Sequence, residues 1–461
     1  MTNTAPQPST PSWIERLWSS IADRGRAYAD VPGAGVPPVE RARQLAAALL
    51  SGRGEASGAA LARELLAELR RLDAGGRLAF CQAVAANFRP DDSRLRVAAE
   101  AYLATPDPAH AAALADAAEP PRQELLRRMN AAPGGTAALV GLRQDILGAL
   151  RAHPGLAPLD ADLRHLFISW FNRGFLELRR IDWNTPAAVL EKLIVYEAVH
   201  EIQGWPDLRR RLGADRRCFA FFHPALPGEP LIFVEVALVR GLAEAVQPLL
   251  APDNEDPAAA TEADTAIFYS ISNCQEGLRG ISFGNFLIKQ VVEDLKQELP
   301  QLTRFATLSP VPGFRRWLDA RLDEPGLLRE DEGGVDLPAL LADTELLADA
   351  ERAAPLRAPL LRLCARYLTE TEPGRGPTDP VARFHLGNGA RLERVNWRAN
   401  LAPRGLRESY GLMVNYLYDP DSIEANHEAF VRAGAVACGP AVNALLAQPT
   451  PKRLAAALRR G

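Results

Sequence analysis

The chain has 461 residues, of which 47% are hydrophobic and 24% charged, and its formal net charge is −4. This length exceeds what one hydrophobic core normally serves, so we expect two domains. The slight negative charge argues against a general nucleic-acid or anionic-membrane surface, and no apolar run reaches the roughly 20 residues of a membrane span. The sequence therefore predicts no nucleic-acid partner, no membrane partner, and a small-molecule ligand.

The cysteines and the first residues indicate the compartment. The five cysteines lack CxxC spacing, and an odd number fits neither a disulfide framework nor a zinc site. The first residues show no basic segment followed by an apolar run, as a secretory signal requires. We expect a cytoplasmic protein without a metal site. Cys274, beside a glycine-rich segment, is either a reactive thiol or a small buried residue, and the second reading is the commoner one.

Residues 1–171 are dominated by alanine, leucine, arginine and glutamate, as in the segment ALARELLAELRRL. Such helix formers, interrupted by clusters of glycine, proline and aspartate, are typical of antiparallel helices with short connections. His110, His153 and His165 are isolated here, and we expect surface or capping roles for them. This part is predicted to be an all-α helical bundle.

Aromatic and β-branched residues become frequent near residue 172. The run from Cys218 to Val239 reads as two strands separated by a turn at Pro227–Pro230. Acidic stretches at residues 251–265 and 323–334 are expected as exposed loops. Residues 172–461 are predicted to form a mixed α/β domain, which makes the chain an α+β protein.

A glycine-rich segment between a predicted strand and a predicted helix gives the strongest binding signal. The strand is expected in residues 265–273, and apolar residues recur every four positions from 287 to 299 in the helix. The glycines between them are Gly277, Gly280 and Gly284. Glycine permits close backbone approach, and a helix N-terminus attracts anions, so the segment suits a pyrophosphate. Similar turns also serve as plain connections, and no Walker motif or strict GxGxxG is present.

Two further residues occupy site-like positions. Ser309 ends a second predicted strand within residues 304–314, and ligands of α/β sheets bind beyond the carboxyl ends of strands. His385 lies in a short apolar run before a Gly-Asn-Gly turn, which could expose its ring while backbone groups orient it. The residues alone support a catalytic histidine and a structural turn histidine about equally.

Other polar residues near these segments have two readings each. Arg279, Arg315 and Arg316 either meet a phosphate or face solvent. Tyr410, Asn415 and Tyr416, on a predicted late strand, either line a ligand pocket or serve packing.

Three motifs resemble, in order and character, the malonyl-CoA decarboxylase family: GLRGISFGNFLIKQVVEDL, TLSPVPGFRRWL and FHLGNGARLERVNW. The likeness covers most of residues 171–419. It implies a C-terminal domain of the Gcn5-related N-acetyltransferase (GNAT) type, which binds coenzyme A by its pyrophosphate at the glycine-rich loop. It also implies that Ser309 and His385 are catalytic. The implied malonyl-CoA contact loop comprises Arg279, Gly280, Ile281, Ser282, Phe283, Gly284 and Asn285. Some relatives carry an acidic residue where this chain has Ser282, which puts an essential carboxylate there in doubt.

The resemblance implies a carboxy-lyase of fatty acid metabolism that converts malonyl-CoA to acetyl-CoA and CO2 through an enolate. Since the thioester is itself the electron sink, no metal or organic cofactor is expected. His385, with an ordinary pKa of about 6.5, would protonate C2, and Ser309 would hydrogen-bond the substrate carboxylate or the imidazole. The alternatives are an acyltransferase of the same fold and a non-catalytic acyl-CoA sensor. A homo-oligomer, dimer or tetramer, is expected through the helical domain.

Overall fold

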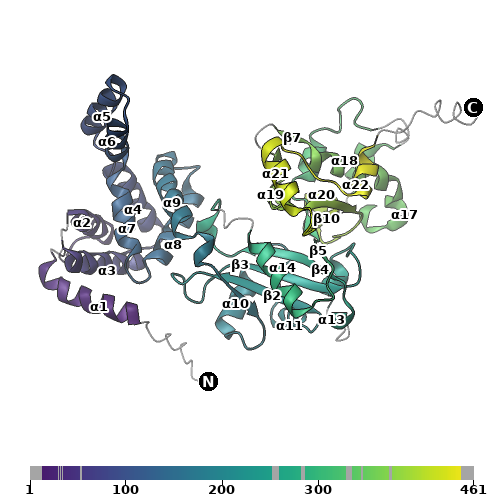
Figure 1. Cartoon of the computed structure of the whole chain (residues 1–461), viewed down its shortest axis with the longest axis horizontal. Coiled ribbons are helices and arrows are strands. Elements are labelled where there is room, and N and C mark those ends of the chain that lie inside the picture. The colour runs from purple at the N-terminus through teal and green to yellow at the C-terminus, as the bar shows by residue number, and fades with distance from the viewer. Residues whose placement is uncertain are drawn as a thin grey trace, which may run out of the picture. The chain divides into compact units, whose positions relative to one another are not determined.

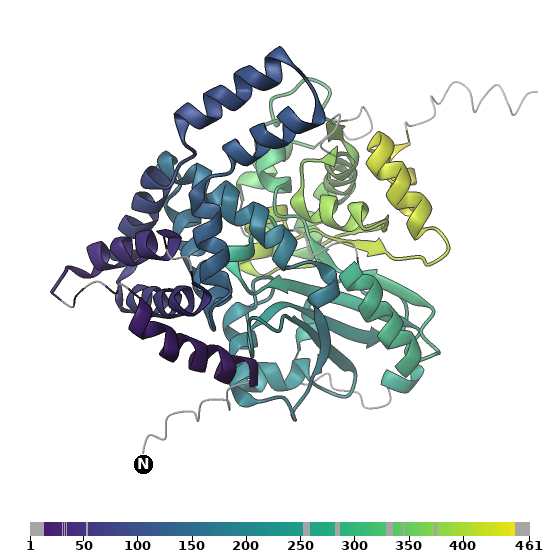
Figure 2. The same ribbon diagram turned by 60° about the vertical axis from the view of Figure 1, so that its left-hand side comes forward.

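The computed structural model describes residues 13–447, apart from residues 30, 32, 34, 52–53, 252–258, 282–285, 329–334, 344–345 and 373–375. The described residues form two compact units, which Figures 1 and 2 show from two directions. The first unit holds the described residues up to Glu177 and those within 222–230 and 275–283. The second holds the rest. Two short segments of the C-terminal region therefore belong to the first unit.

The first unit is helical, as predicted. Its helices are α1 (Trp13–Gly25), α2 (Pro38–Ser51), α3 (Glu55–Arg71), α4 (Ala74–Asn87), α5 (Asp92–Ala104), α6 (Pro108–Ala118), α7 (Pro121–Asn130), α8 (Gly135–Ala149) and α9 (Ala157–Trp170). Leucines at helical spacing, such as Leu45, Leu65, Leu125 and Leu139, are fully buried and form the core. The pair of α5 and α6 extends away from the other helices of this unit (Figure 1).

Aspartates start three consecutive helices of the first unit. The carboxylates of Asp73, Asp91 and Asp107 accept hydrogen bonds of 2.7–2.8 Å from backbone amides three residues further on, at the starts of α4, α5 and α6. Each cap satisfies an amide that the helix leaves without a partner and is worth about 1 kcal/mol. The clusters of aspartate, glycine and proline in the sequence thus mark helix starts.

The second unit is built on a mixed sheet with the strand order β1-β2-β3-β4-β5-β10-β6, and β9 pairs with β10. The strands are β1 (Glu177–Ile181), β2 (Arg216–Phe222), β3 (Pro230–Val239), β4 (Thr265–Asn273), β5 (Arg304–Thr307), β6 (Ser309–Pro310), β9 (Arg391–Asn396) and β10 (Met413–Leu417). A separate two-stranded sheet joins β7 (Thr371–Glu372) and β8 (Gly376–Pro377). The predicted strand pair within residues 218–239 is confirmed as the neighbouring strands β2 and β3.

Strands β4 and β5 pair in parallel, whereas β3 is antiparallel to β4, and β10 is antiparallel to β5, β6 and β9. A parallel pair needs a crossover connection, and helix α14 (Phe286–Glu298) supplies it. The predicted order of strand, glycine segment, helix and strand is therefore confirmed. Val291 and Leu295 of the apolar stripe are fully buried, while Glu293 and Asp294 are exposed.

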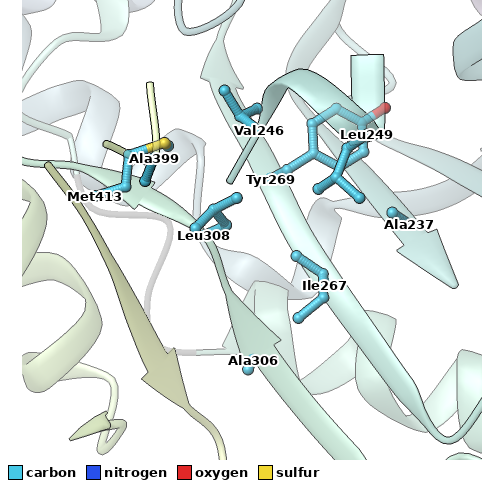
Figure 3. Close-up of a cluster of buried hydrophobic side chains, with 9 residues drawn as sticks. All are labelled: Ala237, Val246, Leu249, Ile267, Tyr269, Ala306, Leu308, Ala399 and Met413. Carbon is cyan, nitrogen blue, oxygen red and sulfur yellow. The ribbon is translucent and has the colours of Figure 1, made fainter. Parts of the chain in front are cut away.

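One face of the sheet carries a buried apolar cluster that joins β3, β4, β5 and β10 (Figure 3). Ile267, Ala306, Leu308 and Met413 project from the strands, and Val246 and Leu249 cover them from the connection after β3. This packing holds the strands together at the point where the chain leaves β5 and reaches Ser309 of β6.

The remaining helices of the second unit are α10 (Ala187–Tyr196), α11 (Trp205–Arg211), α12 (Gln247–Leu250), α13 (Ala259–Glu262), α15 (Phe314–Asp319), α16 (Leu337–Ala342), α17 (Ala350–Ala353), α18 (Arg357–Thr369), α19 (Pro380–Gly387), α20 (Pro403–Ser409), α21 (Ile423–Ala433) and α22 (Pro440–Leu446). A helical unit followed by a mixed sheet-and-helix unit confirms the α+β class. None of the described helices is both long and apolar enough to cross a membrane.

Candidate active site

Ser309 lies where two parallel strands separate. Pairing between β4 and β5 runs from Thr265 opposite Arg304 to Phe268 opposite Thr307, and the Leu308 amide still donates to the Phe268 carbonyl. The chain then turns to β6, in which Ser309 pairs with Val414 of β10. Ligands of open sheets bind at such points, beyond the carboxyl ends of parallel strands. The position expected for Ser309 is the one that the structure gives.

His385 lies in the last turn of helix α19, and not on an exposed turn as the Gly-Asn-Gly sequence suggested. It is buried, with 3% of the residue exposed. Asp379 starts this helix: its carboxylate accepts from the amides of Val381 and Ala382 at 2.9 and 3.0 Å. Because the helix begins directly after Asp379, His385 is a helical residue, and its side chain is buried.

The structure brings Ser309 and His385 together in a chain of hydrogen bonds. The Ser309 Oγ lies 3.1 Å from the His385 Nε2 and 2.8 Å from the Thr307 Oγ1. The His385 Nδ1 lies 2.8 Å from the Tyr418 hydroxyl, so a side chain and not the backbone orients the ring. The Tyr416 ring stacks on the imidazole, with centroids 4.7 Å apart.

Protons can run through this chain in two directions. If the Tyr418 hydroxyl donates to Nδ1, then Nε2 carries the proton and donates to Ser309, which donates to Thr307. If Ser309 donates to Nε2 instead, Nδ1 carries the proton and donates to Tyr418. The four side chains therefore form one coupled proton path.

Burial determines the protonation state of His385. Desolvation lowers the pKa of His385 from 6.5 to about 3, and no described carboxylate beside the ring opposes the effect. Burial also raises the pKa of Tyr418 well above its usual 10. At neutral pH the ligand-free imidazole is therefore neutral, which corrects the expectation of an ordinary histidine pKa.

Asp379 also connects the serine segment to the histidine helix. Its Oδ2 accepts from the Gly313 amide at 3.4 Å and from the Tyr367 hydroxyl at 3.2 Å. Gly313 follows Ser309 by four residues, whereas Asp379 caps the helix of His385. One buried carboxylate, with a pKa that burial raises, thus ties together the two segments that supply the pair.

Sequence reasoning missed Thr307, Tyr418 and Asp379. Thr307 precedes Ser309 by two residues, which is the spacing of side chains on one face of a strand. Tyr418 stands in the same relation to Tyr416. Asp379 carries a helix-start signal, an aspartate directly before a proline.

The other polar residues of the late strand are engaged elsewhere. The Asn415 amide nitrogen donates to the backbone carbonyls of Thr307 and Ala243, and the Tyr410 hydroxyl donates to Asp319. Of the three residues considered for a ligand pocket, Tyr416 is the one that contacts His385. Arg315 lies over the Tyr410 ring at 4.8 Å.

The structure describes the glycine-rich segment as far as Ile281. Gly277 packs on helix α8, where an added Cβ would come within 2.0 Å of the Val140 carbonyl oxygen. Close helix packing therefore accounts for the lack of a side chain at this position. Gly280 has φ +79°, a backbone conformation that residues with a side chain rarely adopt, although the space around it is open. Residues Ser282, Phe283, Gly284 and Asn285 lie outside the described residues.

A buried arginine holds the described part of this segment in the first unit. The Arg143 guanidinium donates to the carbonyls of Gly277 and Arg279 at 2.8 and 2.9 Å and pairs with Asp160 at 2.9 Å. The side chain of Arg143 is 2% exposed, whereas that of Arg279 is exposed and lies 3.8 Å from Glu276. Ile281 is buried.

Among the residues that the structure describes, no group of histidine, cysteine, aspartate or glutamate side chains is placed to hold a metal ion. The fold and the site define a class: an α+β protein that holds a serine–histidine pair, suited to proton transfer, at the carboxyl end of parallel strands.

Comparisons with known proteins identify the family. The model of the malonyl-CoA decarboxylase C-terminal domain matches residues 174–456, and that of the N-terminal domain matches residues 88–171. The chain therefore belongs to the malonyl-CoA decarboxylase family.

Curated relatives and solved structures agree. The chain is 37% identical to a mitochondrial malonyl-CoA decarboxylase of Anser anser anser over 335 residues, which is 68% of this chain and 66% of that protein. It is 36% identical to the Rattus norvegicus enzyme over 70% of each chain. Crystal structures of malonyl-CoA decarboxylases from Rhodopseudomonas palustris and Agrobacterium vitis, each 51% identical, cover 88% of this chain with TM-scores of 0.81 and 0.82. The matches cover 99% and 100% of those two chains.

Proposed function

We propose that this protein is a carboxy-lyase that converts malonyl-CoA to acetyl-CoA and CO2, as the names of its relatives indicate. The observation that carries the proposal is the buried contact between the Ser309 Oγ and the His385 Nε2 at the end of paired parallel strands. Family membership supplies the substrate, and this pair supplies a route for the proton that the reaction consumes.

The first step breaks the bond between C2 and the carboxylate. Its electron pair moves toward the thioester carbonyl, neutral CO2 leaves, and an enolate remains. Desolvation favours this step, because a carboxylate loses its charge as CO2 departs. Since the thioester accepts the electrons, we propose that no metal or organic cofactor is needed. Full activity after dialysis against EDTA would support this, and loss of activity that Zn2+ or Mg2+ restores would contradict it.

The second step protonates C2. The imidazole is neutral in the free protein, because its pKa is about 3. A negative charge about 4 Å away, at an effective dielectric constant of about 20, contributes about 4 kcal/mol, or about 3 pKa units. The bound substrate therefore raises the pKa of His385 toward neutrality. We propose that the imidazolium gives its proton to C2 through Ser309 and returns to the neutral form.

Coenzyme A is proposed to contact the segment from Arg279 to Asn285, which precedes helix α14. Gly280, with its positive φ and open surroundings, and Arg143, which fixes the carbonyls of Gly277 and Arg279, support a preformed backbone there. Amides near a helix start suit a pyrophosphate.

The test is incubation of the purified full chain with malonyl-CoA and measurement of acetyl-CoA and CO2. We expect equal amounts of both products, and a loss of at least about 100-fold in kcat for Ser309→Ala and His385→Gln. His153→Gln, an exposed histidine of the first unit, is the matched control. Binding of malonyl-CoA without release of CO2 would refute the proposal. Acetyl transfer to an amine would then favour an acyltransferase, and binding alone would favour a sensor.

We also propose a homo-oligomer, dimer or tetramer, formed through residues 1–171, with residues 172–461 as the catalytic domain. Helix α1 supports this, because Trp13, Ile14, Leu17 and Ile21 are 38–66% exposed and recur along one side of the helix. Sedimentation that gives a monomer mass at all concentrations would refute it. Sedimentation of Leu17→Glu beside the control Leu103→Glu on α5 would test the surface.

A cytoplasmic location is likewise a proposal. It is supported by the five free cysteines, which are typical of a reducing compartment. The goose and rat relatives are named as mitochondrial. Fractionation of the native host would test it, and recovery with membranes or outside the cell would contradict it.

A further inference from the structure

The second unit contains a cavity of about 790 Å³ that the proposed reaction does not use. It is lined by the connection after α10 (residues 197–203), by residues 246–251 and by the start of α20 (residues 400–407). The described lining residues include neither Ser309 and His385 nor their hydrogen-bond partners. Cavities of about 300–1,000 Å³ are the usual size of small-ligand sites.

A buried histidine nitrogen in the wall lacks a partner. His200 is 7% exposed, and its Nε2 makes no hydrogen bond within the described residues. The ring makes a hydrogen bond with the backbone of Tyr269, and burial lowers its pKa to about 4, so the ring is neutral. With Nδ1 donating to the backbone, Nε2 is a free acceptor. A buried acceptor without a donor costs about 1–3 kcal/mol, which a ligand donor would offset.

The charges around the cavity favour an anion. Arg404 and Arg407 lie three residues apart on α20, and therefore on one face of it. Arg404 donates to the Ala198 carbonyl and to Glu408, whereas Arg407 is exposed and makes no ion pair or hydrogen bond with any described residue. Desolvation is the main cause of the lowered pKa of His200, and the charges of Arg211 and Arg404 lower it further.

Two carboxylates also line the cavity, Glu197 and Glu201, so the anionic group is placed at the arginines and not beside these carboxylates. Glu197 is buried, and its oxygens accept from the amides of Val199 and His200 at 2.7 Å and from the hydroxyls of Ser270 and Ser272 at 2.8 and 3.2 Å. Protein donors therefore occupy its oxygens, although its negative charge remains. Glu201 is exposed to solvent, where its charge is screened.

We propose that this cavity binds a small anion that also carries a hydroxyl or N–H donor. The anionic group lies against Arg404 and Arg407, and the donor occupies the His200 Nε2. A phosphate ester and a carboxylate of a hydroxylated metabolite share this chemistry. The described lining residues of the cavity include neither Ser309 nor His385, and the proposal does not depend on the proposed reaction.

Calorimetric titration of the full chain tests the proposal with four probes. Glycerol 3-phosphate and glycerate carry both groups, propyl phosphate lacks the hydroxyl, and glycerol lacks the anion. We expect saturable binding of glycerol 3-phosphate or glycerate, weaker binding of propyl phosphate, and none of glycerol. The better of the first two probes identifies the anion as phosphate or carboxylate.

Variants assign the two ends of the ligand. Arg407→Ala should weaken binding of the anionic probes at least about tenfold, whereas Arg432→Ala on α21, an exposed arginine paired with Glu428, should leave it unchanged. His200→Phe should reduce glycerol 3-phosphate to the affinity of propyl phosphate, and His200→Gln, which restores an acceptor, should recover part of the difference. Thermal unfolding of each variant establishes that it is folded, and Arg407→Ala tests the proposal independently of His200.

Three results would overturn the proposal. The first is no saturable binding by any probe at millimolar concentrations. The second is equal affinity in the wild type and Arg407→Ala. The third is displacement of the probe by coenzyme A together with a raised KM for malonyl-CoA in Arg407→Ala, which would make the cavity part of the acyl-CoA site. The first two results do not require the decarboxylase proposal to hold, since binding is measured without turnover.

Discussion

Gly313→Ala tests whether close packing of Gly313 against Tyr367 holds the segment after Ser309 in place. Gly313 has φ −100° and ψ −10°, which alanine adopts without strain, so a backbone effect is excluded. An added Cβ would lie 2.2 Å from the Tyr367 hydroxyl oxygen, 3.3 Å from the Tyr367 Cζ and 3.7 Å from the Asp379 Oδ2. The hydroxyl must therefore move by about 1 Å, and overpacking of this kind costs about 1–3 kcal/mol.

The Tyr367→Phe variant turns this into a double-mutant cycle. Alone it removes the hydrogen bond to Asp379 (3.2 Å) and should cost about 1–2 kcal/mol. In Gly313→Ala/Tyr367→Phe the clashing oxygen is absent, so the double variant should be about 1–2 kcal/mol more stable than the sum of the single effects. Urea denaturation measures the free energies of unfolding, with Gly141→Ala as the control, because no atom lies within 4 Å of its Cβ. That exposed helical position should gain about 0.5–1 kcal/mol.

Activity should follow the same cycle. A shift of about 1 Å near a reacting pair lowers kcat by up to about 100-fold, so Gly313→Ala should lose at least about tenfold and the double variant should recover most of that loss. Strictly additive free energies of unfolding, or a Gly313→Ala variant as stable and active as the wild type, would refute the reasoning.

Three further outcomes are expected. Burial lowers the pKa of His385 to about 3, below the 6.5 of the unfolded chain. Between pH 3 and pH 6.5 the unfolded chain therefore binds a proton at this residue that the folded chain does not. The contribution of His385 to the free energy of unfolding is present above pH 6.5 and falls by up to about 1.4 kcal/mol per pH unit as the pH decreases toward 3. His385→Asn should flatten this slope in urea titrations at pH 5, 6 and 7, and parallel slopes would contradict the burial argument. Tyr418→Phe should lower kcat about tenfold by freeing the Nδ1 side of the ring, whereas Tyr416→Phe, whose lost hydroxyl has no partner among the described residues, should change kcat little; equal effects would argue against the proton path. Arg143→Ala should raise the KM for malonyl-CoA about tenfold at nearly constant kcat, with Arg143→Lys intermediate, and a change confined to kcat would show that this arginine does not act through binding.

Local patterns in the sequence predict much of this fold. The helical spacing of leucines in residues 1–171 predicts the first unit, and the alternation of strand-like and helical runs predicts β4, α14 and β5. Ser309 could be placed because the end of a strand is a local feature. These signals depend on neighbours within about ten residues, which a single sequence displays.

The features that sequence could not supply depend on distant contacts. Gly277 signals an anion loop in isolation, but its lack of a side chain serves packing on Val140. Arg143 is one arginine among many in a helical segment, and its hydrogen bonds reach carbonyls more than 130 residues away. The position of His385 was misjudged for a related reason: the glycines after it describe where α19 ends, whereas Asp379 before it determines that the residue is helical.

The burial of His385 and the stoichiometry of the proposed reaction support each other. Decarboxylation of malonyl-CoA consumes one proton per turnover, and a donor that is charged before the substrate binds would bind the carboxylate strongly and oppose its loss as CO2. A neutral buried imidazole weakens this ground-state stabilisation, because the cost of charging a desolvated ring offsets part of its attraction to the carboxylate. The charge that develops on the enolate then strengthens the interaction with the imidazolium in the transition state. The negative charge of the bound substrate thus gives the histidine its proton, and the ring returns to the neutral form that desolvation favours once this proton has moved to C2.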